Sequence, residues 1–212
     1  MIVLDNLTKR FKATVAVDSL SLTIEPGKII GILGPNGAGK STTIKSIVGG
    51  VIPTDGSISV NGLNPLKNRH ELSHSIGYMP QSASLYLDLT ALENVVFFAR
   101  LHGVQQPRKK ARELLALLGL EDKLNIKVQG FSGGMKTRVS LACTLIHNPK
   151  IVILDEPTAG LDPELKRTLW NMFNEFAEQG RTVIISTHVL RAQWAGTDKR
   201  EPREGQLQLP VS

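Results

Sequence analysis

The 212-residue chain carries 25 Lys and Arg against 19 Asp and Glu, a formal net charge of +6, and 41% of its residues are hydrophobic. This length and balance favour one folded domain and exclude disordered, collagen-like and coiled-coil chains. No apolar stretch approaches the roughly 20 residues that span a bilayer, and no signal-peptide pattern opens the chain, so we expect it to stay in the cytoplasm.

The basic residues are scattered along the chain except for one cluster, Arg108, Lys109, Lys110 and Arg112. Pro107 before the cluster and the leucines after it predict an amphipathic helix with a solvated basic face, with a lipid- or nucleic-acid-binding patch as the alternative. We expect no nucleic-acid partner. The single cysteine, Cys143, lies in an apolar pattern and is expected to be a buried small hydrophobe.

Strand signals alternate with helical ones along the chain. Alternating apolar residues predict a half-buried strand over residues 20–24, and a continuous β-branched run predicts a fully buried strand over 28–33. A helix is expected over 41–48, ended by two glycines. Further short strands are predicted over 58–60, 76–79, 151–154 and 182–186. Further helices are predicted over 92–101, 108–118, 133–146 and 163–179. The pattern is that of an α/β core interrupted by a helical insertion.

The chain changes character after His188. Residues 196–205 show neither a helical nor a strand period and are expected to be exposed coil. We therefore expect residues 191–212 to form an atypical, poorly ordered tail.

A glycine-rich phosphate-binding motif follows the buried strand at 28–33. It matches the pattern G-x-x-x-x-G-K-[ST] at every fixed position, and a predicted helix follows it. Such a loop directs backbone N–H groups and a helix N-terminus at phosphate oxygens. Lys40 would reach the β- and γ-phosphates, Ser41 would place its hydroxyl on Mg²⁺, and Thr42 would lie close enough to contact phosphate. The residues of the loop are Gly34, Pro35, Asn36, Gly37, Ala38, Gly39, Lys40 and Ser41.

Two carboxylates close the strand predicted over 151–154. Asp155 would hold Mg²⁺ directly or through water, and Glu156 would orient and partly deprotonate the attacking water. These two motifs alone leave kinases, GTPases, helicases and transport ATPases open.

A third motif narrows this choice. Ser132, Gly133 and Gly134 stand at the start of a predicted helix and offer a second anion-binding surface made of a hydroxyl, backbone N–H groups and the helix dipole. With Met135 and the basic residue after it, this segment resembles the signature sequence of ATP-binding-cassette (ABC) proteins, in a form similar to exporter-type subunits.

Other positions match that family in order. The resemblance implies that Phe11 stacks on adenine, that the Gln81 amide reaches Mg²⁺ or the attacking water, and that Asp162 aligns the opposing site. It also implies that His188 contacts the γ-phosphate and supports the water held by Glu156. It covers about residues 1–190 and ends directly after His188, where the family's usual acidic helix and further strands are not seen. Whether that ending is natural, truncated or frame-shifted stays open.

The resemblance implies a fold and a domain division. The fold is α/β: a P-loop NTPase (RecA-like) core with an N-terminal antiparallel β subdomain and an inserted α-helical subdomain. A single domain over residues 1–190 would have its core in 1–84 and 149–190 and the helical subdomain in about 85–148.

The resemblance also implies a function. Two ATPase subunits, identical or different, would bind ATP and Mg²⁺ at a head-to-tail interface, with the signature of one closing on the γ-phosphate of the other. A separate membrane permease would be driven by them, with export favoured and the chain peripheral on the inner face of the membrane. Two alternatives stay open: a cassette that binds nucleotide but is catalytically defective because of its tail, and a soluble ABC ATPase that acts on ribosomes or DNA.

Overall fold

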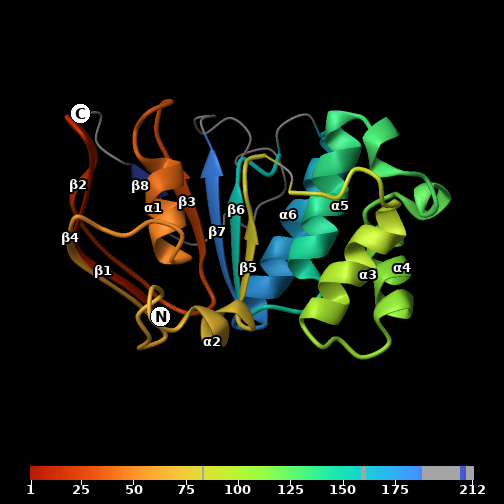
Figure 1. Ribbon diagram of the computed structural model, residues 1–212, viewed down its shortest axis with the longest axis horizontal. Helices are drawn as coiled ribbons and strands as arrows, with labels where there is room; N and C mark the ends of the chain where they lie inside the picture. The colour runs from red at the N-terminus through yellow and green to blue at the C-terminus, as the bar shows by residue number, and fades with distance from the viewer. Residues whose placement is uncertain (83, 159–160, 188–205, 209–212) are drawn as a thin grey trace.

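Two sheets stand side by side in the molecule, with a helix between them and further helices on the far side of the second sheet (Figure 1). The computed structural model describes residues 1–82, 84–158, 161–187 and 206–208. The first sheet is antiparallel, with strand order β2-β1-β4. Its strands are β1 (Ile2–Phe11), β2 (Thr14–Ile24) and β4 (Asp55–Val60).

The second sheet is parallel throughout, with strand order β5-β6-β7-β3-β8. Parallel neighbours need crossover connections, and the helices of an α/β fold supply them. The α/β expectation is confirmed by this sheet. Its strands are β3 (Ile29–Leu33), β5 (Ile76–Met79), β6 (Ile151–Asp155), β7 (Thr182–Thr187) and β8 (Gln206–Gln208).

Helices occupy the segment between β5 and β6, which lies on the side of the parallel sheet away from the antiparallel one (Figure 1). That segment contains α3 (Ala91–Leu101), α4 (Pro107–Leu117), the short 3-10 turns η1 (Glu121–Lys123) and η2 (Val128–Gly130), and α5 (Gly133–Leu145). The remaining helices are α1 (Lys40–Ile47), α2 (Arg69–Ser73) and α6 (Pro163–Glu178).

Strand periodicity divides the apolar side chains of the parallel sheet between two cores. Ile153 and Ile184 face the antiparallel sheet and pack with Ile44 of α1, whereas their neighbours Val152 and Val183 face the helical side. Fully burying a side chain such as Ile44 contributes about 1.5–3 kcal/mol, so α1 is firmly held between the two sheets. The loop that precedes α1 is therefore held from both sides.

The strands and helices expected in the core are confirmed to within a few residues, except that β2 begins six residues earlier than expected and β4 three. Sequence reasoning assigned no residue range to β1 and missed α2. It was wrong to expect no strand after His188, because β8 pairs with Gly31–Leu33 of β3. The sequence of β8, Gln206, Leu207 and Gln208, alternates polar and apolar residues, which suits a strand at a sheet edge. The remaining tail residues lie outside the described part of the chain.

Cys143 lies in the helical-side core with 7% of its surface exposed, which confirms its expected burial. Burial raises the pKa of its thiol, so the side chain behaves as a neutral apolar group. Among the described helices, none is both long enough and apolar enough to span a membrane.

Candidate functional site

Polar residues from three strands meet at one edge of the parallel sheet. The glycine-rich loop follows β3, Asp155 is the last residue of β6, and Gln81 comes two residues after β5. Strands β6, β7 and β3 are parallel neighbours, so their carboxyl ends share one edge. In open α/β sheets ligands bind outside the carboxyl ends of the strands, which makes this edge the candidate site.

The end of the glycine-rich loop is shaped by its contact with β2. Gly39 precedes α1 with φ +82°, and a Cβ atom at this position would collide with the backbone carbonyl of Ala16. Only glycine meets both requirements, the left-handed backbone and the close approach. The first N–H groups of α1 have no partner within the helix, so they are available to an anion at this end.

Lys40 begins α1 and is largely buried, with 7% of its surface exposed. Its ammonium donates hydrogen bonds to the carbonyls of Gly34 and Pro35, at 2.7 and 3.0 Å. The positive charge is thereby held inside the loop, beside the N-terminus of α1. Both features favour a bound phosphate.

Asp155 and Glu156 are organised by a serine that sequence reasoning missed. The Ser186 hydroxyl donates a hydrogen bond to the buried Asp155 carboxylate, and the Ser186 hydroxyl oxygen accepts one from the Glu156 N–H at 3.1 Å. Ser186 lies opposite Asp155 in the register of β6 and β7. The signal in the sequence was a polar residue near the carboxyl end of each of two buried strands.

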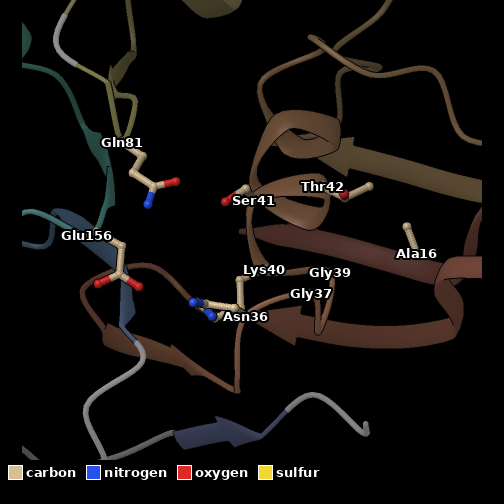
Figure 2. A pocket seen from close by; sticks show the side chains of 9 residues that line it. All are labelled: Ala16, Asn36, Gly37, Gly39, Lys40, Ser41, Thr42, Gln81 and Glu156. Carbon is tan, nitrogen blue, oxygen red and sulfur yellow. The ribbon is translucent and has the colours of Figure 1, made fainter. Parts of the chain in front are cut away.

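The backbone at Glu156 is in the left-handed region, with φ +57°. This conformation is uncommon for a residue with a Cβ atom, and strain of this kind costs on the order of 1–3 kcal/mol. The turn directs the Glu156 carboxylate into the same space as Gln81 (Figure 2).

These groups line a pocket of about 320 Å³. Figure 2 shows Gln81 and Glu156 on one side and the glycine-rich loop and the start of α1 on the other. Ala16 of β2 completes the wall, and sequence reasoning did not single it out. The lining residues are Ala16, Asn36, Gly37, Gly39, Lys40, Ser41, Thr42, Gln81 and Glu156.

The pKa of Tyr78, a residue of β5, responds to its burial and to the charge of Asp155 at the site. Burial and the nearby Asp155 carboxylate raise the pKa of Tyr78 to about 12. Its phenol is therefore neutral at physiological pH.

Hard oxygen donors suited to Mg²⁺ are present at this edge. Ser41 and Gln81 line the pocket, and Asp155, the last residue of β6, directly precedes the pocket residue Glu156. Mg²⁺ in phosphate sites is usually held by one or two protein oxygens together with phosphate and water. Among the described residues no three His, Cys, Asp or Glu side chains are arranged as a metal-binding group.

The Ser132 turn does not line this pocket. Ser132 is the N-cap of α5, and its hydroxyl accepts a hydrogen bond from the Met135 N–H at 3.3 Å. Ser132 and Gly133 are exposed, and a Cβ atom on Gly133 would meet open space. The turn is thus a helix N-terminus that faces outward from its own chain.

Asp162 also lies away from the pocket and caps α6, where it accepts a hydrogen bond from the Leu165 N–H at 2.9 Å. That bond, with a contribution from Arg138, lowers the pKa of Asp162. Arg138 of α5 pairs with Asp162 at 3.7 Å and donates to the Gly119 carbonyl at 3.3 Å. Sequence reasoning missed Arg138, which connects the Ser132 helix to the Asp162 turn.

Phe11 ends β1 with 48% of its surface exposed and is not part of the pocket wall. It pairs with Thr14, two residues before the pocket residue Ala16, so it lies near the rim. His188 falls outside the described residues.

The comparison with known proteins decides the family. A family model described as "ABC transporter" matches residues 17–159, more than half of the chain. The chain belongs to the ABC transporter family. The matched range contains the glycine-rich loop, the Ser132 turn and the acidic end of β6.

Relatives and solved structures agree with this placement of the cassette. It is 37% identical over 193 residues to the linearmycin resistance ATP-binding protein of Bacillus subtilis (strain 168), covering 90% of the cassette and 62% of the relative. It is 40% identical over 185 residues to the Nod factor export ATP-binding protein I of Burkholderia thailandensis (strain ATCC 700388 / DSM 13276 / CCUG 48851 / CIP 106301 / E264), covering 86% and 60%. The cassette thus spans about three-fifths of the length of these relatives.

A solved dimeric ATP-binding cassette, in a post-hydrolysis state with bound ADP and Pi, superposes with a TM-score of 0.83 at 32% identity. The match covers 90% of this chain and 89% of that one. The expectation of an ABC-type P-loop NTPase fold is confirmed.

Proposed function

We propose that this cassette binds and hydrolyses Mg-ATP at the interface of a head-to-tail dimer and thereby powers export through a separate membrane permease. The observation that carries the proposal is the pocket in which Lys40, Ser41, Gln81 and Glu156 meet. Its walls supply a phosphate cradle on one side and a carboxylate on the other. These are the two requirements of phosphoanhydride hydrolysis by water.

Each pocket residue has a role in this proposal. The backbone of residues 34–39 and the Lys40 ammonium hold the β- and γ-phosphates. Ser41, Gln81 and Asp155 would hold Mg²⁺, which would supply charge neutralisation on the phosphate oxygens. Glu156 orients the attacking water and accepts its proton, and Thr42 contacts phosphate. On the strength of the family resemblance, Phe11 is assigned the adenine contact and His188 the γ-phosphate contact.

The Ser132 turn supports the dimer part of the proposal. Ser132, Gly133 and Gly134 present a hydroxyl, N–H groups and a helix dipole outward, away from the pocket of their own chain. A second copy would place this surface on the γ-phosphate, and Asp162 would align with it. The likeness to a dimeric cassette supports the same arrangement.

Export is supported by the names of the relatives, which include Nod factor export and linearmycin resistance ATP-binding proteins. A permease partner is supported by the match to the ABC transporter family. The helical segment between β5 and β6, together with the Gln81 loop, is the surface that we assign to the permease. The membrane association of the cassette follows from that contact.

Light scattering after size exclusion of the Glu156→Gln protein tests the proposal. Removing the carboxylate blocks hydrolysis, so Mg-ATP is expected to shift the protein from monomer to dimer, and ADP is not. Adding Ser132→Arg is expected to abolish the shift while ATP still binds. A protein that binds ATP and stays monomeric, or a dimer indifferent to Ser132→Arg, would contradict the dimer mechanism.

A further inference from the structure

The exposed ring of Phe11 is held from one side by a lysine of the same strand. The Lys9 ammonium lies over the Phe11 ring, 4.8 Å from its centroid. Lys9 and Phe11 are two residues apart on β1, so their side chains leave the same face of the strand. A cation over an aromatic face is attracted by the electron density of the ring.

A second contact fixes the lysine. Its ammonium donates a hydrogen bond of 2.8 Å to the carbonyl of Ile52, in the segment between α1 and β4. Two further bonds tie this segment to the end of β1: Thr54 N–H to the Thr8 carbonyl at 2.8 Å, and Arg10 N–H to the Thr54 hydroxyl at 3.0 Å. The ammonium is thus anchored to a braced part of the backbone and not only to the ring.

The pair of Lys9 and Phe11 lies close to the wall of the pocket. Ala16, on the paired strand, lies in the pocket wall against Gly39 of the phosphate loop. Phe11, paired with Thr14, is close to that wall along the same hairpin. One ring face is taken by the ammonium, and 48% of the Phe11 surface remains exposed for a second planar group.

We propose that Lys9 is a positioning residue for the nucleotide base: it fixes the Phe11 ring and draws electron density toward one face, so that adenine stacks on the other. The inference rests on the proposed function, in which Phe11 receives adenine. It adds that the stack has three members, ammonium, phenyl ring and base. The lysine itself touches neither the base nor the phosphates.

The experiment measures nucleotide affinity by isothermal titration in the Glu156→Gln background, with Mg-ATP and with Mg-tripolyphosphate, which has the phosphates but no base. Lys9→Met keeps the length of the side chain and removes its charge. It is expected to weaken ATP binding about 2- to 5-fold, the value of an exposed cation–π contact. Tripolyphosphate affinity is expected to be unchanged.

Companion variants make the result specific. Lys9→Arg is expected to restore ATP affinity, because a guanidinium also stacks on an aromatic ring. Phe11→Ala is expected to weaken ATP binding about 5-fold or more, as for loss of a base–aromatic stack. In the Phe11→Ala background, Lys9→Met is expected to add nothing, because the ring through which it acts is gone. With Glu156 restored, the Lys9→Met change is expected in KM for ATP.

Two contrary outcomes are distinguishable. If Phe11→Ala leaves ATP affinity intact, the adenine-stacking role in the proposed function fails, and the Lys9 inference fails with it. If Phe11→Ala weakens ATP binding but Lys9→Met does not, or weakens tripolyphosphate binding equally, the Lys9 inference alone is overturned. Thermal unfolding of each variant identifies any that loses the fold.

Discussion

The pocket at Lys40 and the turn at Ser132 both lie at helix N-termini, yet the first is lined by residues from several elements and the second faces outward. Around Lys40, side chains from α1, the Gln81 loop and the end of β6 converge on one space. Around Ser132, the hydroxyl accepts a hydrogen bond from its own helix, and a Cβ atom on the neighbouring Gly133 would meet open space. Under the proposed function, this difference would separate binding from catalysis: one chain would hold a nucleotide, and a second surface would be needed to act on it.

The largest predicted effects come from one substitution in each of the two regions, the pocket at Lys40 and the turn at Ser132. Lys40→Met removes the charge held in the loop, so ATP affinity is expected to fall about 10- to 100-fold, and turnover with it. Ser132→Arg is expected to abolish dimerisation and phosphate release while the ATP affinity of the monomer is retained. Titration calorimetry and a phosphate-release assay measure the two effects.

Gln129→Arg is the matched control for Ser132→Arg, because it adds the same charge at an exposed position three residues upstream. It is expected to behave as wild type. Equal losses of monomer ATP binding in Lys40→Met and Ser132→Arg would mean that the two regions do not differ as described.

The second prediction concerns how Ser186 positions Asp155 and Glu156 at the pocket. Ser186→Ala removes the hydroxyl that bonds the Asp155 carboxylate and the Glu156 N–H. Losing a hydrogen bond to a charged group costs about 1.5–3 kcal/mol, so kcat is expected to fall roughly 10-fold or more, with ATP binding largely kept. Steady-state kinetics measure the change. Ser140→Ala, a buried serine of α5, is the control and should leave kcat intact; an unchanged kcat in Ser186→Ala would exclude the positioning role.

The smallest effect concerns how α5, the helix behind the Ser132 turn, is attached at its other end. His147 follows α5, donates its Nε2–H to the Ile76 carbonyl at 3.2 Å and stacks on His102 with centroids 4.0 Å apart. Burial lowers the pKa of His147 to about 4, with further contributions from His102, His74 and Arg181. This histidine is therefore neutral in the folded protein at pH 7.

The sign of the pH effect follows from this lowered pKa. The unfolded chain gains a proton near pH 6.5 and the folded chain only near pH 4, so folding stability is full above pH 6.5 and declines as the pH falls toward 4. Because the ring is partly exposed, we expect a loss of about 1–2 kcal/mol from this group. Urea unfolding of wild type and His147→Gln at pH 7.5 and 5 measures it. Parallel pH profiles for the two proteins would show that His147 is not responsible.

Much of this architecture was predictable from the sequence. The run at Ile29–Leu33 is apolar and β-branched, and the phosphate motif follows it directly, so strand, loop and helix were placed together. The starts of α5 and α6 were visible because Ser132 and Asp162 are N-cap residues that stand directly before the predicted helices. Local rules therefore fixed the elements that carry motifs.

Tertiary contacts were not predictable in the same way. Strand β1 lacks a clean alternation because its pairing with β2 contains irregularities, and its assignment depends on the partner strand. Four residues contact partners that are far away in the sequence or on the same face of a strand: Ser186, Ala16, Arg138 and Lys9. Strand β8 depends on the edge of β3 for its pairing, because an alternation of three residues is too short to predict a strand by itself.

The left-handed backbone at Glu156 sets activity against stability at a single residue. Glycine would adopt the same φ without steric cost, and so would relax the chain there, but it would remove the carboxylate that lines the pocket. A glycine at this position would therefore stabilise the fold but, under the proposed function, abolish hydrolysis. A glutamate in this strained position is what the proposed function expects of the residue that orients the attacking water.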